Sequence, residues 1–159
     1  MNDSFTIEKV TPDNFDELTG LIIALAEFEK LDPPDMEARA RLRKDCFADN
    51  PRFESYLGYM DGIAVGYAII FETYSSFLAK PTLYLEDLFV LPEYRKRGVG
   101  YSLFLFLASL AVERGNGRME WQVLDWNENA INFYNRLGSS HLSGWYPYRL
   151  TEDELKKIV

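Results

Sequence analysis

The sequence is poor in the residues that bind metals and form disulfides. Its 159 residues include one cysteine, Cys46, and one histidine, His141. A single cysteine cannot form an internal disulfide, and the two residues together do not make a cluster of soft metal ligands. We therefore expect no disulfide and no metal site.

The sequence also lacks a long apolar run and an excess of positive charge. Its most apolar helical stretch, residues 102–112, is about half the length of a membrane span, and the N-terminus has no basic flank followed by an apolar run. The 17 Lys and Arg against 25 Asp and Glu give a formal net charge of -8. This balance argues against a nucleic-acid binder and fits either a cationic partner or a solvated acidic surface. We expect a cytoplasmic protein whose partners include neither membrane nor nucleic acid.

Apolar residues, in contrast, are abundant enough to form a core. Hydrophobic residues make up 47% of the chain and aromatic residues 15%. A chain of this length fits one ordinary domain, and it contains no internal repeat, low-complexity tract or linker. We predict a single domain over residues 1–159.

The periodicity of apolar residues predicts a mixed α/β fold. The dipeptide Asp61-Gly62 between two β-rich runs predicts a hairpin. The expected strands are Phe5–Val10, Phe53–Met60, Ile63–Glu72, Thr82–Val90, Met119–Leu124 and Trp145–Leu150. The expected helices run from Thr11-Pro12-Asp13 to about Lys30, over Met36–Phe47, from about Gly100 to Arg114, over Asn127–Leu137, and from the capping box at Thr151.

The turn Arg95-Lys96-Arg97-Gly98-Val99-Gly100 lies between an expected strand and an expected helix. Free backbone N–H groups and the positive end of a helix meet an anion in this arrangement. Gly98 and Gly100 leave room for a pyrophosphate, and three cations gather on an otherwise acidic chain. The turn lacks the Gly-Lys-Ser/Thr ending of a P-loop, and Leu103 replaces the third glycine of a dinucleotide fingerprint. The alternative is an ordinary basic loop.

Two motifs resemble one known family. Arg95-x-x-Gly98-x-Gly100, preceded by Leu88-Phe89-Val90, resembles the acetyl-CoA-binding signature of the GNAT superfamily of N-acetyltransferases. Residues 126–134, from Trp126-Asn127-Glu128 to Phe133-Tyr134, resemble its second conserved block. Tyr84-Leu85-Glu86-Asp87 is similar to the branch of diamine (spermidine/spermine) and thialysine acetyltransferases. The resemblance implies an acyltransferase that uses acetyl-CoA, works as a homodimer, and has a mostly antiparallel mixed sheet flanked by helices. In that sheet the central strands, ending at Val90 and Leu124, splay apart.

The resemblance also implies which residues contact acetyl-CoA. The pantetheine arm would bond to the strand backbone, the pyrophosphate would lie in the glycine turn, and the thiol end would meet the second block. These cofactor-binding residues are Leu88, Phe89, Val90, Arg95, Lys96, Arg97, Gly98, Val99, Gly100, Tyr101, Asn127, Glu128, Asn129 and Ala130.

Two residues match the catalytic positions of the family. An alkyl amine with a pKa near ~10.4 must lose a proton before it attacks a thioester, and Glu86 matches the base. Strand alternation predicts that Asp87 points to the opposite face, so that the two carboxylates do not act as a dyad. Tyr134 matches the acid that protonates the leaving thiolate, and helical spacing puts it on one face with Asn127 and Ala130. The alternatives are a surface carboxylate for Glu86 and a packing role for Tyr134.

The implied acceptor is a small cationic amine. Acidic side chains would attract it and aromatic rings would contact it through cation–π interactions. Two departures from the polyamine pattern, Ser75-Ser76-Phe77 and Ser143, make a shorter diamine, a lysine-like amino acid or thialysine comparable candidates. A protein or peptide N-acetyltransferase and a non-catalytic acetyl-CoA-binding regulatory domain are the rival functions. The expected substrate-binding residues are Phe28, Glu29, Glu86, Glu120, Trp121 and Gln122.

Overall fold

The computed structural model describes residues 4–159, which fall into two compact units that divide between Gln122 and Val123. The first unit contains the whole β-sheet with three α-helices. The second contains two shorter helices and an extended segment. The prediction of a single domain stays a prediction.

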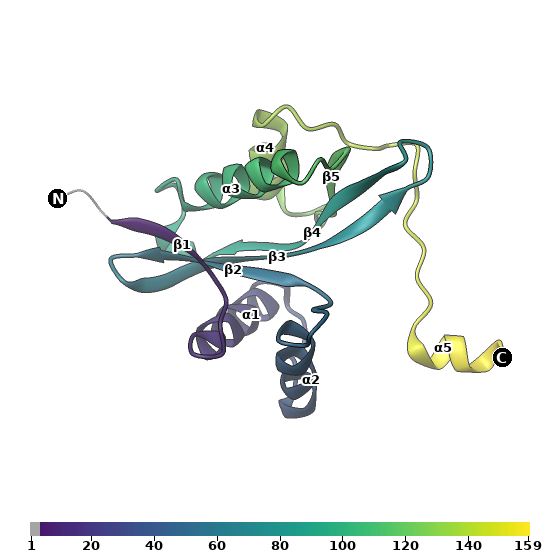
Figure 1. Cartoon of the computed structure of the whole chain (residues 1–159), viewed down its shortest axis with the longest axis horizontal. Coiled ribbons are helices and arrows are strands. Elements are labelled where there is room, and N and C mark those ends of the chain that lie inside the picture. Colours follow the sequence, from purple (N-terminus) through teal and green to yellow (C-terminus); the bar gives the residue numbers. More distant parts are fainter. Residues whose placement is uncertain (1–3) are drawn as a thin grey trace. The chain divides into compact units, whose positions relative to one another are not determined.

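A five-stranded mixed sheet forms the centre of the first unit (Figure 1). Neighbouring strands are antiparallel, except for the last pair, which is parallel. Asp61 and Gly62 both have positive φ, at 51° and 78°, as the two-residue turn of a tight hairpin requires. The predicted hairpin is therefore confirmed. In spatial order the strands are β1 (Phe5–Lys9), β2 (Glu54–Met60), β3 (Ile63–Ser75), β4 (Lys80–Val90) and β5 (Arg118–Trp121).

Helices cover both faces of this sheet (Figure 1). Helices α1 (Phe15–Glu29) and α2 (Met36–Cys46) lie on one face, and α3 (Val99–Glu113) lies on the other. Leu18 of α1 packs with Tyr67 of β3 in the core of the first face, whereas the fully buried Leu103 of α3 packs with Val65 on the second. Burial of these side chains is the main driving force for assembly of the layers.

Some predicted boundaries were wrong. Helix α1 begins at Phe15 rather than beside Pro12, because the Asn14 side chain accepts a hydrogen bond from the Thr11 N–H (2.8 Å) and holds residues 11–14 in a turn. Strand β5 ends at Trp121, short of the expected Leu124. A short 3-10 helix, η1 (Pro92–Tyr94), has no counterpart among the predicted elements.

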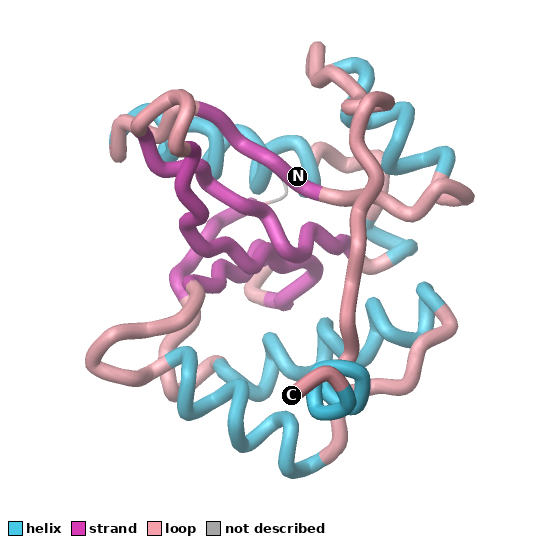
Figure 2. The backbone as a smooth tube through the Cα atoms, turned by 90° about the vertical axis from the view of Figure 1, so that its right-hand side faces the viewer, coloured by secondary structure: helices cyan, strands magenta, loops and turns pink. Residues whose placement is uncertain are grey.

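The second unit holds α4 (Glu128–Arg136) and α5 (Glu152–Lys157). Thr151 and Glu154 form the predicted capping box at the start of α5. The predicted strand Trp145–Leu150 is wrong, and the segment between α4 and α5 is drawn as loop in Figure 2. Pro147 removes a backbone donor there, and within residues 4–159 no strand pairs with the segment. None of the helices described in this range combines the length and apolar character that crossing a membrane requires.

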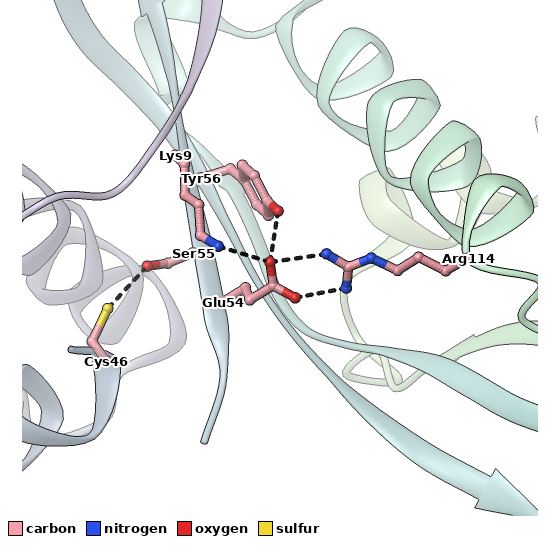
Figure 3. Close-up of polar contacts among 6 residues, drawn as sticks. All are labelled: Lys9, Cys46, Glu54, Ser55, Tyr56 and Arg114. Carbon is pink, nitrogen blue, oxygen red and sulfur yellow. Dashed lines mark hydrogen bonds and ion pairs between the residues drawn. The ribbon is translucent and has the colours of Figure 1, made fainter. Parts of the chain in front are cut away.

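One charged cluster joins β1, β2 and the end of α3 (Figure 3). The Glu54 carboxylate accepts two hydrogen bonds from Arg114 (2.6 and 3.0 Å), one from Lys9 (3.1 Å) and one from Tyr56 (3.0 Å). The bonds from Arg114 are the main reason that the pKa of Glu54 falls to about 2. The cluster is internally paired, and we assign it a role in holding the layers together.

Cys46 lies near this cluster, with its sulfur 3.6 Å from the Ser55 hydroxyl (Figure 3). The thiol is buried, and burial raises its pKa. A buried thiol that resists ionisation is a poor nucleophile, so Cys46 is suited to packing rather than to chemistry.

Candidate active site

The edge of β4 that faces away from β3 is open over its last residues. Strand β5 pairs with β4 only from Thr82 to Leu85, and β4 then continues alone to Val90. Pairing between β4 and β5 thus ends at Leu85 and Trp121, and the rest of β4 is left without a partner on this side among the described residues. An open strand edge offers unpaired N–H and C=O groups to an amide-bearing ligand.

The hydrogen-bonding phase of β4 shows which residues face this open edge. The Leu91 N–H donates to the Val65 carbonyl of β3 (2.9 Å). Facing residues in an antiparallel ladder alternate between bonded and non-bonded pairs. Phe89 therefore bonds with β3, while the backbone groups of Leu88 and Val90 point to the open edge. The two outward-facing residues are the ones expected to bind pantetheine through their backbone.

The glycine turn connects this edge to the N-terminus of α3. Gly98 has φ of 85° and precedes the first helical residue, and it has no side chain to cap the helix. A Cβ at Gly98 would meet no atom within 4 Å, and one at Gly100 would meet only Val90 at 3.6 Å. The space beside these two glycines at the start of α3 is thus open, and an open helix N-terminus fits an anionic phosphate.

The three cations of the turn have different surroundings. Arg95 donates through Nε to the Val90 carbonyl (2.9 Å), and its guanidinium lies 4.6 Å from the centre of the Phe28 ring. Arg97 lies over the Tyr94 ring, while Lys96 is exposed and has φ of 62°. The Arg95 side chain therefore connects the turn to the end of α1. Lys96 and Arg97 are both exposed, whereas Arg95 is half-buried.

A β-bulge in β4 changes the expected arrangement of the acidic residues. Ile69 pairs with Asp87 and Ile70 with Leu85, so Glu86 has no partner on β3. An inserted residue of this kind interrupts the alternation of side chains. Glu86 and Asp87 consequently line the same groove, and the prediction that they point to opposite faces is wrong.

This groove lies between the sheet and the two N-terminal helices and has a volume of about 570 Å³. We call it the acceptor groove, because the amine acceptor is expected beside Glu86. Its walls come from α1, the α1–α2 connection, α2, the residues before β2, β3 and β4. Apolar side chains form most of the lining, and Glu86, Asp87 and Arg52 are its charged residues. The complete lining is Ile22, Pro34, Ala38, Leu42, Arg52, Phe53, Ile69, Phe71, Glu86 and Asp87.

Asp87 is the more buried of the two carboxylates. The Tyr67 hydroxyl donates a hydrogen bond to its Oδ2 atom (3.1 Å). Burial nevertheless raises the pKa of Asp87 to about 6, with smaller contributions from the charges of Glu86 and Glu29. Burial also raises the pKa of Glu29, the last residue of α1. Sequence reasoning missed Asp87 and Tyr67 as site residues, because no local pattern indicates the bulge.

The remaining expected substrate residues lie on both faces of the sheet. Glu120 pairs with Tyr84 across the β4–β5 ladder and forms an ion pair with Arg118 (3.1 Å). Trp121 packs edge-on against Phe104 of α3, with ring centres 5.4 Å apart, and so faces away from the acceptor groove. Gln122 follows β5 and is exposed.

The Phe28 ring makes a cation–π contact, as predicted, but the cation is an arginine of this protein and not a substrate amine. The Arg95 guanidinium lies over its ring, and the Phe89 ring centre lies 6.3 Å away. The ring is half-buried beside the first core. Phe28 therefore makes a cation–π contact with the glycine turn.

In the second unit, α4 organises the second motif. Asn127 is the N-cap of the helix, and its side chain accepts a hydrogen bond from the Ala130 N–H (3.2 Å). Glu128 and Asn129 occupy the exposed first turn. Tyr134 is on the same helix, and burial raises the pKa of its hydroxyl to about 12. The hydroxyl thus carries its proton at neutral pH and can act as a donor.

Comparison with known proteins gives matches over most of the chain. Residues 21–139 match the model of the acetyltransferase (GNAT) family. The chain is 33% identical to a thialysine N-epsilon-acetyltransferase of Caenorhabditis elegans, and the match covers 98% of each chain. It is 45% identical over 98 residues to an L-ornithine N5-acetyltransferase of Arabidopsis thaliana, a match that covers 62% of this chain and 43% of the relative.

Solved structures show the same fold. An integron cassette protein from the mobile metagenome of V. cholerae superimposes with a TM-score of 0.83 at 23% identity, covering 98% of this chain and 97% of that one. An aminoglycoside N-acetyltransferase, AAC(6')-Iy, solved in complex with CoA, gives a TM-score of 0.77 at 22% identity over 94% and 97% of the two chains.

Proposed function

The chain belongs to the acetyltransferase (GNAT) family, and we propose that it transfers the acetyl group of acetyl-CoA to a primary amine of a small cationic substrate. The amine attacks the thioester directly in a ternary complex, so no covalent enzyme intermediate is needed. The candidate acceptors are a diamine or polyamine and a lysine-like amino acid such as thialysine. The named relatives, a thialysine and an L-ornithine N-acetyltransferase, support this range of acceptors.

The observation that carries this proposal is the pair of carboxylates in the acceptor groove. Glu86 and Asp87 line a groove with mostly apolar walls and lie at the point where β4 leaves β5. A protonated amine would be attracted to this acidic end. The amine then transfers its proton to Glu86, directly or through one water, and its nitrogen attacks the thioester carbon.

Binding of the acetyl donor, acetyl-CoA, involves backbone groups of β4 and α3 and the residues of the second motif. At the open strand edge, Leu88 offers its N–H and C=O groups and Val90 offers its N–H group, while the Val90 carbonyl accepts the Arg95 hydrogen bond. The start of α3 offers N–H groups for the pyrophosphate. When the carbon–sulfur bond breaks, the Tyr134 hydroxyl would give its proton to the sulfur of the departing coenzyme A. The second proton that the nitrogen loses as the amide forms would restore the Tyr134 hydroxyl. Asn127 to Ala130 would lie near that sulfur.

The two rival functions differ from this proposal in what they require. A protein or peptide N-acetyltransferase would need room for a main chain at the carboxylates, and a non-catalytic acetyl-CoA sensor would need no proton acceptor or donor. The full-length similarity to small-molecule N-acetyltransferases favours the small amine.

Release of coenzyme A thiol from acetyl-CoA tests the proposal. We expect turnover with diamines or lysine-like amino acids and kcat/KM values at least about tenfold lower with lysine-containing peptides of matched charge, because a peptide cannot enter a groove built for a small amine. Acetyl-CoA binding without turnover on any amine would support the sensor, and a preference for peptides would support a protein acetyltransferase.

Gly98→Asn should weaken acetyl-CoA binding by about tenfold or more, because the new side chain would occupy the space expected for the pyrophosphate. Asparagine tolerates positive φ, so the fold should persist. Gly115→Asn is the matched control, since Gly115 also has positive φ (71°) and open space around it, at the other end of α3. Equal Kd values for acetyl-CoA in the two variants, measured by calorimetry, would place the phosphate site elsewhere.

We further propose that the protein is a cytoplasmic homodimer that has neither a membrane nor a nucleic acid as a partner. The aromatic side chains of Trp145, Tyr146 and Tyr148 are 79%, 82% and 95% exposed. Together with the strand-like pattern of residues 145–150, these apolar surfaces support contact with a second copy of the chain. Sedimentation equilibrium at several protein concentrations tests the dimer, and a monomer mass throughout would contradict it.

A further inference from the structure

We infer that the acceptor groove recognises a diamino acid with a free α-carboxylate, and that Arg52 is the residue that binds this carboxylate. The inference rests on the proposed acetyltransferase function and narrows its substrate class. The ω-amine lies at Glu86 and Asp87, the aliphatic chain lies along the apolar walls, and the carboxylate lies at Arg52.

The charges in the groove have opposite signs and lie on opposite sides of β3. Arg52 lies two residues before β2, whose first residue, Glu54, pairs with Ile70 of β3. Asp87 in β4 pairs with Ile69, on the other side of the same strand. Two strand spacings, about 10 Å, thus separate β2 from β4, which carries the carboxylates, and Arg52 lies in the segment that leads into β2. A short substrate with an ammonium group at one end and a carboxylate at the other fits charges of opposite sign on opposite sides of β3.

Apolar side chains fill the distance between the charged ends. Phe53 stands beside Arg52, and Ile69 and Phe71 lie along β3, with Leu42 of α2 opposite the sheet. The methylene chain of a diamino acid would bury apolar surface against these side chains. A substrate with additional polar groups along its methylene chain should bind less well, because the apolar lining would leave those groups without hydrogen-bond partners.

Arg52 can exchange its present partner for a substrate at little cost. Its Nε atom lies 3.6 Å from Asp45, and its side chain is 79% exposed. An exposed ion pair of this kind contributes little to stability. The guanidinium can therefore turn to a substrate carboxylate and form two parallel hydrogen bonds with it, while Asp45 remains nearby for the α-ammonium group.

A diamine or polyamine would meet this groove differently. Its second ammonium group would approach Arg52, and two like charges would repel each other. The carboxylate of a diamino acid converts this repulsion into attraction. Arg52 thus discriminates between substrates that share the same reactive amine.

Paired substrates test the inference. We would measure kcat/KM by thiol release for L-lysine against 1,5-diaminopentane and for L-ornithine against 1,4-diaminobutane, which differ by the carboxylate alone. The unaltered enzyme should prefer each amino acid by about tenfold or more, and Arg52→Gln should reduce this ratio by about tenfold, mainly through KM. L-lysine amide, in which the carboxylate is neutralised, should lose activity with the unaltered enzyme and respond little to Arg52→Gln.

Two further variants complete the design. Arg52→Lys keeps the charge without the bidentate geometry and should retain part of the preference. Arg41→Gln removes another exposed arginine, which pairs with Glu37 on α2 and is not among the residues that line the groove, and it should leave the ratio unchanged. The role of Arg52 would be overturned if Arg52→Gln lowered kcat/KM equally for amino acids and diamines, or if the unaltered enzyme showed no preference. Either result would leave the proposed acetyltransferase function standing. Absence of turnover with every amine would overturn the proposed function, and this inference with it.

Discussion

Tyr134→Phe is expected to lower kcat by about 10²- to 10⁴-fold while the Kd for acetyl-CoA changes by less than about twofold. The Tyr134 hydroxyl, with a pKa raised to about 12 by burial, keeps its proton at neutral pH and can transfer it to the departing sulfur. Phenylalanine preserves the ring, which packs edge-on against Phe133 with centres 5.2 Å apart. Thiol release at saturating substrates gives kcat, and calorimetry gives the affinity.

A second tyrosine of the same unit provides the control. Tyr148 is 95% exposed, and Tyr148→Phe removes a hydroxyl without touching α4. This variant should keep the kcat of the unaltered enzyme. An unchanged kcat in Tyr134→Phe would assign Tyr134 to packing, which is the alternative that the sequence left open.

The sequence predicts most of the fold because local patterns determine many of its elements. Asp61-Gly62 specifies the β2–β3 hairpin through backbone conformations that few residues adopt, and Thr151 with Glu154 specifies the start of α5. The mostly antiparallel sheet follows from the resemblance to the family. A pattern cannot supply a pairing partner, however, and the alternation over residues 145–150 therefore predicted a strand that does not form.

The candidate site was less predictable, because contacts between distant segments shape it. The bulge at Glu86 depends on how β4 pairs with β3, and it brings Asp87 into the groove. Arg95 is among the expected cofactor-binding residues, and its guanidinium lies over Phe28, 67 positions earlier in the chain. No local sequence pattern predicts either the bulge or the contact between Arg95 and Phe28. The glycine turn, in contrast, has a local signature, and the roles of Leu88 and Val90 follow from the resemblance to the family and stay predictions.

Glu86→Gln is expected to lower kcat/KM for the acceptor amine by about 10²- to 10⁴-fold, because an amide cannot take the proton that the amine must lose. Glutamine retains the size and much of the hydrogen-bonding capacity of the side chain, and Glu86 is exposed at the bulge, so the fold should be preserved. Thiol release over a range of pH with saturating acetyl-CoA measures this effect. Full activity in Glu86→Gln would remove Glu86 from the proton transfer.

The pH dependence of kcat/KM in Asp87→Asn distinguishes the role of Asp87 from that of Glu86. Burial raises the pKa of Asp87 to about 6, so the group loses its charge, and its attraction for the cationic amine, as the pH falls through that value. The acceptor amine stays protonated throughout this range, so the acidic limb of kcat/KM reports on the enzyme. Asp87→Asn should abolish this limb. Glu86→Gln should move it to lower pH, because the charge of Glu86 helps to raise the pKa of Asp87. A limb that persists unchanged in Asp87→Asn would assign the titration to another group.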